Sequence, residues 1–191
     1  MSGAPRRLRL LYAPTNVHAW ACSRAAAIDD ELRRAAPEAR ALALPWHEWS
    51  LCDDGEHLVN AALPAFATAL ARAVVDAWDE GGDREEGREV LVLSDSSIDH
   101  YADGADVVRR ALAAHGVLRA TVDAVCGSGF AVAPAFAGRL RRPGRTRGGG
   151  VLVLVGGWND AWHSAASERE LRASVRRFCA AARRWTAAAT G

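Results

Sequence analysis

The sequence contains no lysine: all 24 of its basic residues are arginine, set against 23 acidic residues. This absence excludes a phosphate-binding P-loop lysine, a Schiff-base lysine and a Ser-Lys catalytic dyad. Cysteine is also scarce, and the few cysteines form no Cys-x-x-Cys pair and have no histidine at the spacing of a zinc site. We therefore expect no metal site, no organic cofactor, and free thiols at Cys22, Cys52, Cys126 and Cys179.

A strong net charge and long apolar runs are missing as well. The formal net charge is +1, so bulk electrostatics indicates neither a nucleic-acid nor a membrane partner. No apolar run approaches the roughly 20 residues that cross a bilayer, and residues 1–9 lack the apolar segment of a signal peptide. We expect a cytoplasmic protein whose partner is a small molecule, and nothing in the sequence indicates an oligomeric state.

What the sequence does contain is short apolar runs that alternate with helical patterns. The runs predict strands near 8–13, 39–45, 90–93, 120–125 and 151–155. Apolar periodicity predicts helices over 20–35, 60–78, 103–115 and from Ser167 onward. Alternating strands and helices predict an α/β fold, a three-layer α/β/α sandwich with a five-stranded parallel sheet, as one domain over 1–191.

Several local features of these elements can be tested. The helix over 60–78 is apolar nearly all round, so we expect it to be well buried. In the first helix, Asp29–Arg33 and Asp30–Arg34 have the i,i+4 spacing of ion pairs. Ser167-Glu168-Arg169-Glu170 has the pattern of a capping box. The arginine- and glycine-rich stretch 138–150 predicts a solvated surface loop rather than a phosphate-binding patch, because no aromatic residues interleave it.

Small polar residues follow the apolar runs, at the sheet edge where open α/β folds keep their sites. A nucleophilic serine needs a base within hydrogen-bond reach, an acid that orients the base, and donors aimed at the oxyanion. Ser96 is the candidate nucleophile, and Asp54-Gly55-Glu56-His57 supplies an Asp-x-x-His pair. Gly129 offers an unobstructed backbone N–H, and Asn159 offers a side-chain amide.

These blocks resemble those of the SGNH (GDSL-type) hydrolases. Ser94-Asp95-Ser96 stands for the Gly-Asp-Ser block and Ser128-Gly129-Phe130 for the glycine block. Gly157-Trp158-Asn159-Asp160 stands for Gly-x-Asn-Asp, and 54–57 for the Asp-x-x-His block. The resemblance implies that Ser96 is the nucleophile, His57 the base and Asp54 its orienting acid. It also implies an oxyanion hole formed by the N–H of Ser96, Gly129 and Asn159, and a fold of the flavodoxin-like kind.

The chain departs from the family in two respects. Its Asp-x-x-His block precedes the serine block, whereas in the family it comes last. A circular permutation accounts for this order, with the charged linker 79–88 joining the old carboxyl end to the old amino end. Permuting the family's sheet predicts the strand order 4-3-5-1-2 in this chain's own numbering. The second departure is Ser94, which occupies the position of the family's glycine.

Other residues near these blocks have competing interpretations. Asp160-Ala161-Trp162-His163 is a second Asp-x-x-His sequence, which makes His163 a substitute base or a pocket residue. His100, Asp99 and Asp103 fit turn or cap positions, and Cys126 fits a structural role. Trp158 and Trp162 fit the core better than a ligand contact, although a tryptophan beside Asn159 can line an acyl or ring pocket.

Together these features predict a serine esterase that hydrolyses a small ester, such as an acyl group on a sugar or a specialised metabolite. Ser96 forms an acyl-enzyme, and water activated by His57 releases the acid. An acyltransferase would use the same residues with a second alcohol or amine in place of water. The competing class is non-catalytic: a flavodoxin-like module that binds a small ligand at helix amino termini, or a triad-bearing protein that has lost its activity.

Overall fold

The computed structural model describes residues 10–13, 23–42, 44–45, 49, 52, 57–79, 89–141 and 150–187, without the side chains of 78, 79 and 187. Five parallel strands form one sheet: β1 (Leu10–Ala13), β2 (Arg40–Ala41), β3 (Glu89–Ser94), β4 (Arg119–Ala124) and β5 (Val151–Val155). The helices are α1 (Ser23–Ala35), the 3-10 turn η3 (Asn60–Ala62), α2 (Leu63–Asp79), α3 (Ser96–Asp99), α4 (Gly104–Ala114), α5 (Phe136–Arg139), α6 (Trp158–Trp162) and α7 (Glu168–Ala187).

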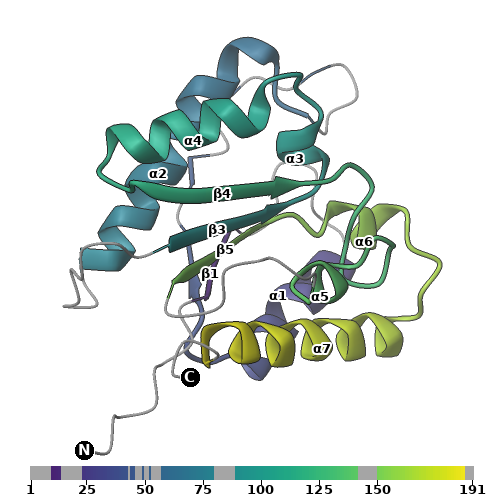
Figure 1. The fold of residues 1–191 in the computed structure, drawn as a ribbon. Helices are drawn as coiled ribbons and strands as arrows, with labels where there is room; N and C mark the ends of the chain where they lie inside the picture. Colours follow the sequence, from purple (N-terminus) through teal and green to yellow (C-terminus); the bar gives the residue numbers. More distant parts are fainter. Residues whose placement is uncertain are drawn as a thin grey trace, which may run out of the picture.

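The strand order is β2-β1-β5-β3-β4. Read from the other edge this is 4-3-5-1-2, the order predicted from the permuted blocks. Helices α2 and α4 cover one face of the sheet, and α1, α5 and α7 cover the other, which gives the predicted three layers (Figure 1). Helices α3 and α6 lie at the end toward which β3 and β4 point. The predicted fold class is confirmed.

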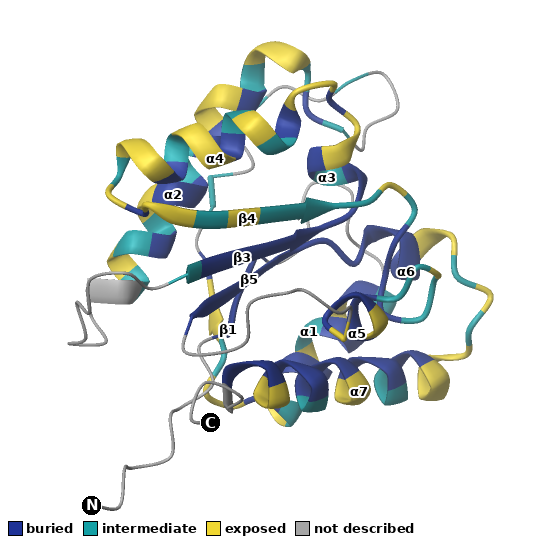
Figure 2. Cartoon of the chain, in the orientation of Figure 1, coloured by how far each residue is buried: buried dark blue, intermediate teal, exposed yellow. Residues whose placement is uncertain are grey.

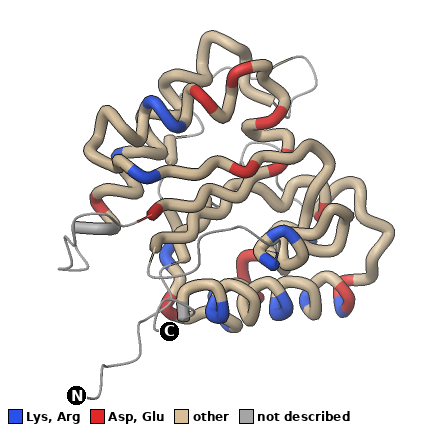
Figure 3. Tube along the Cα trace, viewed as in Figure 1, with Lys and Arg blue, Asp and Glu red and all other residues tan. Residues whose placement is uncertain are grey.

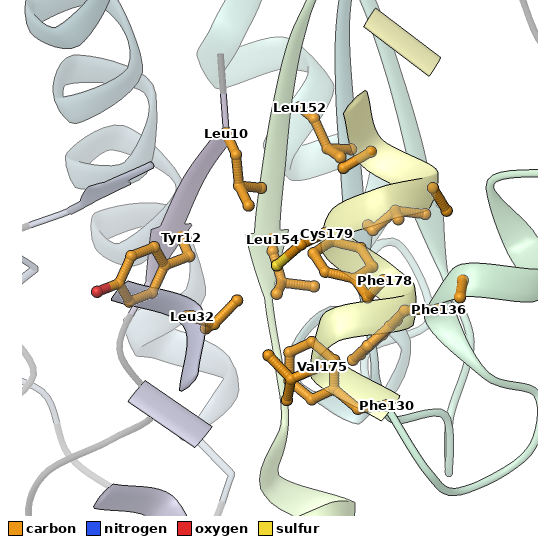
Figure 4. Close-up of a cluster of buried hydrophobic side chains, with 14 of the residues drawn as sticks. Leu10, Tyr12, Leu32, Phe130, Phe136, Leu152, Leu154, Val175, Phe178 and Cys179 are labelled. Carbon is orange, nitrogen blue, oxygen red and sulfur yellow. The ribbon is translucent and has the colours of Figure 1, made fainter. Parts of the chain in front are cut away.

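The central strands are apolar because both faces of the sheet are covered. In β3, Leu91 and Leu93 pack in the cluster under α1 and α7, and Val90 and Val92 pack in the cluster under α2 and α4. Figure 2 shows β3 and β5 as the buried centre of the molecule, with the exposed residues on the outer sides of the helices. Figure 4 shows the first cluster, in which aromatic rings from α5 and α7 lie against β5. Alternate residues of one short strand therefore contribute to two separate cores.

Two expectations about the elements on either side of the 43–57 segment are wrong. Helix α2 is buried on one face only: Phe66, Leu70 and Val74 are inaccessible, but Pro64 and Ala65 are exposed. Alanine reads as apolar in the sequence yet has little surface to bury, so an alanine-rich helix can face solvent. The second strand is also shorter than the predicted 39–45, because pairing with β1 is confined to two residues.

The predicted capping box is present in the structure, whereas the ion pairs of α1 differ from those predicted. The capping box of α7 is confirmed, since the Ser167 N–H donates to Glu170 at 2.8 Å and the Glu170 N–H to the Ser167 hydroxyl at 3.4 Å. The ion pairs of α1 have i,i+3 spacing instead: Arg33 pairs with Asp30, and Arg34 with Glu31, both at 2.8 Å. Arg34 thus pairs with Glu31, which faces α7, and not with Asp30, whereas Asp29 and Arg33 still interact through their charges.

Charged groups also join α1 to α7, whose arginines lie along its outer side (Figure 3). Glu31 is 1% exposed and pairs with Arg176 at 3.0 Å and with Arg172 at 3.5 Å. Burial raises the pKa of Glu31, but hydrogen bonds and charge from Arg176, Arg172 and Arg34 outweigh burial and lower it overall. Among the described residues no helix is long and apolar enough to cross a membrane.

Candidate active site

The candidate nucleophile begins a helix directly after the central strand. Ser96 is the first residue of α3 and is 7% exposed. Asp95 caps this helix by accepting bonds from the Ser97 N–H at 2.9 Å and the Ser97 hydroxyl at 2.7 Å. A residue in the first turn of a helix has no intrahelical acceptor for its N–H. The Ser96 N–H is therefore available to a group bound at its own side chain.

Asp95 also ties the end of β3 to the end of β5. Its second carboxylate oxygen accepts the Gly157 N–H at 3.1 Å. Gly157 has φ of 113°, a backbone conformation that side chains with a Cβ rarely adopt, so glycine is required at this turn. Asp95 is fully buried, and burial raises the pKa of its carboxyl against the lowering effect of the Ser97 and Gly157 donors. Its partners are all uncharged.

Asp160 makes the corresponding link from β5 to the segment after β4. Its carboxylate accepts the backbone N–H groups of Phe130 at 2.5 Å, Ala131 at 2.7 Å and Val132 at 3.3 Å. Burial raises the pKa of Asp160, and the charge of Asp95 raises it further. In the second Asp-x-x-His sequence, both Asp160 oxygens thus accept backbone N–H groups, and His163 is an exposed residue at the end of α6.

The expected oxyanion donors are only partly available. Asn159 lies in α6, 8% exposed, and its amide donates one hydrogen to the Ser128 carbonyl at 2.9 Å, which leaves a second N–H. The Gly129 N–H is not unobstructed as predicted, because it donates to the Val132 carbonyl at 3.2 Å. Position 129 requires glycine for another reason: a Cβ there would overlap the Asp160 carboxylate.

The candidate base lies beside the end of α3. The His57 ring stacks on His100 with centroids 4.1 Å apart, and the His100 N–H donates to the Ser96 carbonyl at 3.1 Å. The Tyr101 hydroxyl donates to the carbonyl of Leu58, the residue after His57, at 2.7 Å and so holds this segment against α3. Among the described residues no hydrogen bond joins the Ser96 hydroxyl to the His57 ring, so the structure shows the predicted nucleophile and base near one helix and not in direct contact. Asp54 lies outside the described residues.

A buried arginine under these turns was missed by the sequence analysis. Arg139 is 1% exposed and pairs with Asp123 of β4 at 3.1 Å. It also donates to the Ser94 carbonyl at 2.8 Å and to the Ser128 hydroxyl at 2.7 Å. The predicted surface loop over 138–150 is therefore wrong at its start, and 142–149 lie outside the described residues. The available signal was the apolar context of Arg139, together with an aspartate within the strand.

The remaining residues that the sequence singled out near the site can now be placed. Ser94 is fully buried as the last residue of β3, and its hydroxyl has no hydrogen-bond partner among the described residues. His100 ends α3 and Asp103 precedes α4, as predicted, while Asp99 accepts the Cys126 N–H at 2.6 Å. Trp158 is buried as expected. Trp162 is not a core residue, since it is 50% exposed.

Side chains thus join the ends of three strands. Asp95 joins β3 to β5, and Arg139 joins β4 to β3. Asp160 and Asn159 join β5 to the segment after β4. In the described part of the chain, no group of three or more His, Cys, Asp or Glu could hold a metal ion. Comparisons with known proteins found no matching family model, no matching curated protein and no matching solved structure. The residues of the chain itself therefore carry the functional argument.

Proposed function

We propose that this chain is a circularly permuted SGNH-type serine hydrolase that cleaves a small ester through an acyl-enzyme on Ser96. The observation that carries the proposal is the junction of Ser96 and Asn159: Asp95, which precedes Ser96, accepts the N–H of Gly157, two residues before Asn159. This bond joins the turn that carries Ser96 to the turn that carries Asn159, and the His57 ring stacks on His100, four residues after Ser96. The strand order supports the permutation, because it is the order that the permuted family sheet requires.

In the proposed reaction His57 accepts the proton of the Ser96 hydroxyl as its oxygen attacks the ester carbonyl. The tetrahedral oxyanion accepts hydrogen bonds from the Ser96 N–H and from the second N–H of Asn159. His57 then returns the proton to the departing alcohol, which leaves an acyl group on Ser96. Water, deprotonated by His57, attacks this acyl group and releases the acid. The resemblance assigns Asp54 to orient His57.

The pattern of polar partners supports catalysis over a purely structural turn. A serine that only capped the chain would bond its hydroxyl to nearby backbone, as Ser97 does with Asp95. Ser96 makes no such bond among the described residues, although it is 7% exposed. The free thiols of Cys52, Cys126 and Cys179 support a reducing compartment, so we place the protein in the cytoplasm as part of the proposal.

Intact mass after treatment with a serine-directed fluorophosphonate tests the proposal. We expect one adduct on the wild type, none on Ser96→Ala and much slower labelling of His57→Ala. Ser97→Ala is the matched control, because it removes a neighbouring hydroxyl of the same helix, and it should still be labelled. His163→Ala should label normally, since His163 is exposed and Asp160 does not orient it. A folded wild type that takes no adduct would contradict the proposal and favour a non-catalytic binding module.

A further inference from the structure

Trp162 is the feature near the proposed site that catalysis leaves unexplained. Among the described residues the exposed large hydrophobic side chains are Trp162, at 50%, and Leu118, at 87%. Leu118 precedes β4, at the opposite end of the strand from the candidate site. Trp162 ends the helix that carries Asn159. A single exposed hydrophobic side chain is ordinary on a protein surface. Trp162 differs in that it is paired with a second indole on the helix that carries Asn159, and such a pair offers a rigid aromatic surface to a ligand.

The helix places this indole on the side of Asn159. Residues three and four apart share one face of a helix, so Trp162 lies on the face of both Asn159 and Trp158. The two indoles are 5.9 Å apart with planes tilted by 36°, and Trp158 is 7% exposed. Trp158 therefore supports Trp162 from the protein side. The remaining face of Trp162 is a flat apolar surface one helical turn from an oxyanion donor.

We propose that Trp162 is a substrate-binding residue that stacks against an aromatic ring of the ester. This inference rests on the proposed function and adds the substrate class, an ester with a planar ring in the part held on the α6 side of the Ser96 hydroxyl. Offset stacking on an indole favours a planar ring over a flexible chain of similar apolar area. Stacking of this kind changes affinity by about tenfold.

A matched pair of fluorophosphonates tests the inference on the full chain. One carries a benzyl group and the other an n-hexyl group on phosphorus, with the same fluoride leaving group, and the second-order labelling constant is measured for each. For the wild type we expect the benzyl probe to react faster. Trp162→Ala should lower the benzyl-to-hexyl ratio about tenfold with little change in the hexyl constant, and Trp162→Phe should keep most of the ratio.

Leu118→Ala is the matched control, because it also shortens an exposed apolar side chain but lies far from Asn159, and its ratio should equal that of the wild type. A ratio unchanged in Trp162→Ala, with the hexyl probe still labelling Ser96, would overturn the ring subsite and leave the proposed hydrolase standing. If neither probe labels folded wild type, the proposed function fails and the subsite fails with it. Thermal unfolding of each variant verifies that this surface substitution leaves the fold intact.

Discussion

Buried carboxylates occur in two regions of this molecule, and their surroundings are opposite. Glu31, between α1 and α7, is held by arginines, and its pKa is lowered. Asp95 and Asp160, at the ends of β3 and β5, are held by backbone N–H groups and a hydroxyl, and their pKa values are raised. The first region stabilises a negative charge with positive charge. The second orders backbone turns around uncharged donors.

We interpret the Glu31 region as one that stabilises the fold, and the region of Asp95 and Asp160 as one that fixes the shape of the turns at the strand ends. An arginine beside Asp160 would neutralise its charge, but an arginine has no oxygen that could accept hydrogen bonds from the three consecutive backbone N–H groups of this turn. A carboxylate with two oxygens does this, at the cost of being buried without a counter-charge. The fold tolerates that cost where the turns carry Ser96, Gly129 and Asn159. Proteins commonly store such unfavourable arrangements at functional sites, which agrees with the proposed role of this edge.

The largest effect is expected at Arg139, the one fully buried arginine of the described chain and the exception in the second region. Arg139→Met keeps the apolar stem but removes the ion pair with Asp123 and the hydrogen bond to the Ser94 carbonyl. We expect a loss of about 3–5 kcal/mol in the free energy of unfolding, measured with urea. Arg141→Met, which replaces an exposed arginine two residues away, should change it by less than about 0.5 kcal/mol. Equal losses in both variants would contradict the assignment.

Asp160→Ala is expected to come next. It removes the acceptor of three buried or half-buried N–H groups, and we expect a loss of about 3 kcal/mol. Fluorophosphonate labelling should fall as well, because the turn next to Asn159 loses its anchor. Asp103→Ala removes an exposed carboxylate at a helix start and serves as control, with little loss of either property. An Asp160→Ala variant that is as stable as the wild type and is labelled at the same rate would show that the Asp160 contacts are dispensable.

Glu31→Gln is expected to cost about 1–2 kcal/mol, because its arginine partners are partly exposed and can be solvated. The difference in free energy of unfolding between the wild type and Glu31→Gln should change with pH in the direction opposite to the difference between the wild type and Asp160→Ala. The folded-state pKa of Glu31 is lowered, so its stabilising effect is present above its ordinary value of 4.5 and lost as pH falls through the folded pKa. The advantage of the wild type over Glu31→Gln should therefore grow as pH rises through the acid range.

For Asp160 the sign reverses. Its folded-state pKa is raised, so the folded protein binds its proton more tightly, and the stability it contributes falls as pH rises above 3.8 through the folded pKa. The advantage of the wild type over Asp160→Ala should shrink over that window. Urea unfolding of the three proteins between about pH 3 and about pH 7, a range that extends below and above the ordinary carboxyl pKa values, tests both slopes. Slopes of the same sign would contradict the difference that we describe between the two regions.

The smallest effect is expected at the capping box of α7, which is exposed and contains neither group of buried carboxylates. Ser167→Ala removes the hydroxyl bonded to Glu170 and should cost about 1 kcal/mol, measured as a lower urea midpoint. Labelling of Ser96 should be unaffected. Thr68→Ala, whose hydroxyl bonds back to the Pro64 carbonyl within α2 at the surface, is the comparison variant and should cost less.

The fold was predictable because its signals are local. Apolar runs such as 90–93 stand out as buried strands, and the cyclic order of the polar blocks determined the strand order. The candidates Ser96, His57 and Asn159 stand out in the sequence for the same reason, since each closes or follows a recognisable element, and their catalytic roles stay predictions. The predicted Asp30–Arg34 pair is wrong because Arg34 pairs with Glu31, whose other partners lie on α7, distant in the sequence.

The rest depends on contacts between distant segments. Nothing near Arg139 in the sequence indicates that its partners are Asp123, Ser94 and Ser128. The sequence likewise suggested that Gly129 is a glycine in order to present its N–H, whereas the structure relates it to the Asp160 side chain 31 residues away. A motif identifies which residue types are present. Which atom of each residue is used becomes visible only when the turns are brought together.

A crystal structure of the fluorophosphonate adduct would test the central claim most directly. The account predicts phosphorus bonded to the Ser96 oxygen, with the phosphoryl oxygen within hydrogen-bond distance of the Ser96 N–H and the Asn159 amide, and the His57 ring next to the Ser96 oxygen. The Asp95 and Asp160 contacts should be unchanged. An adduct on another residue, or a phosphoryl oxygen that faces solvent away from Asn159, would contradict the account.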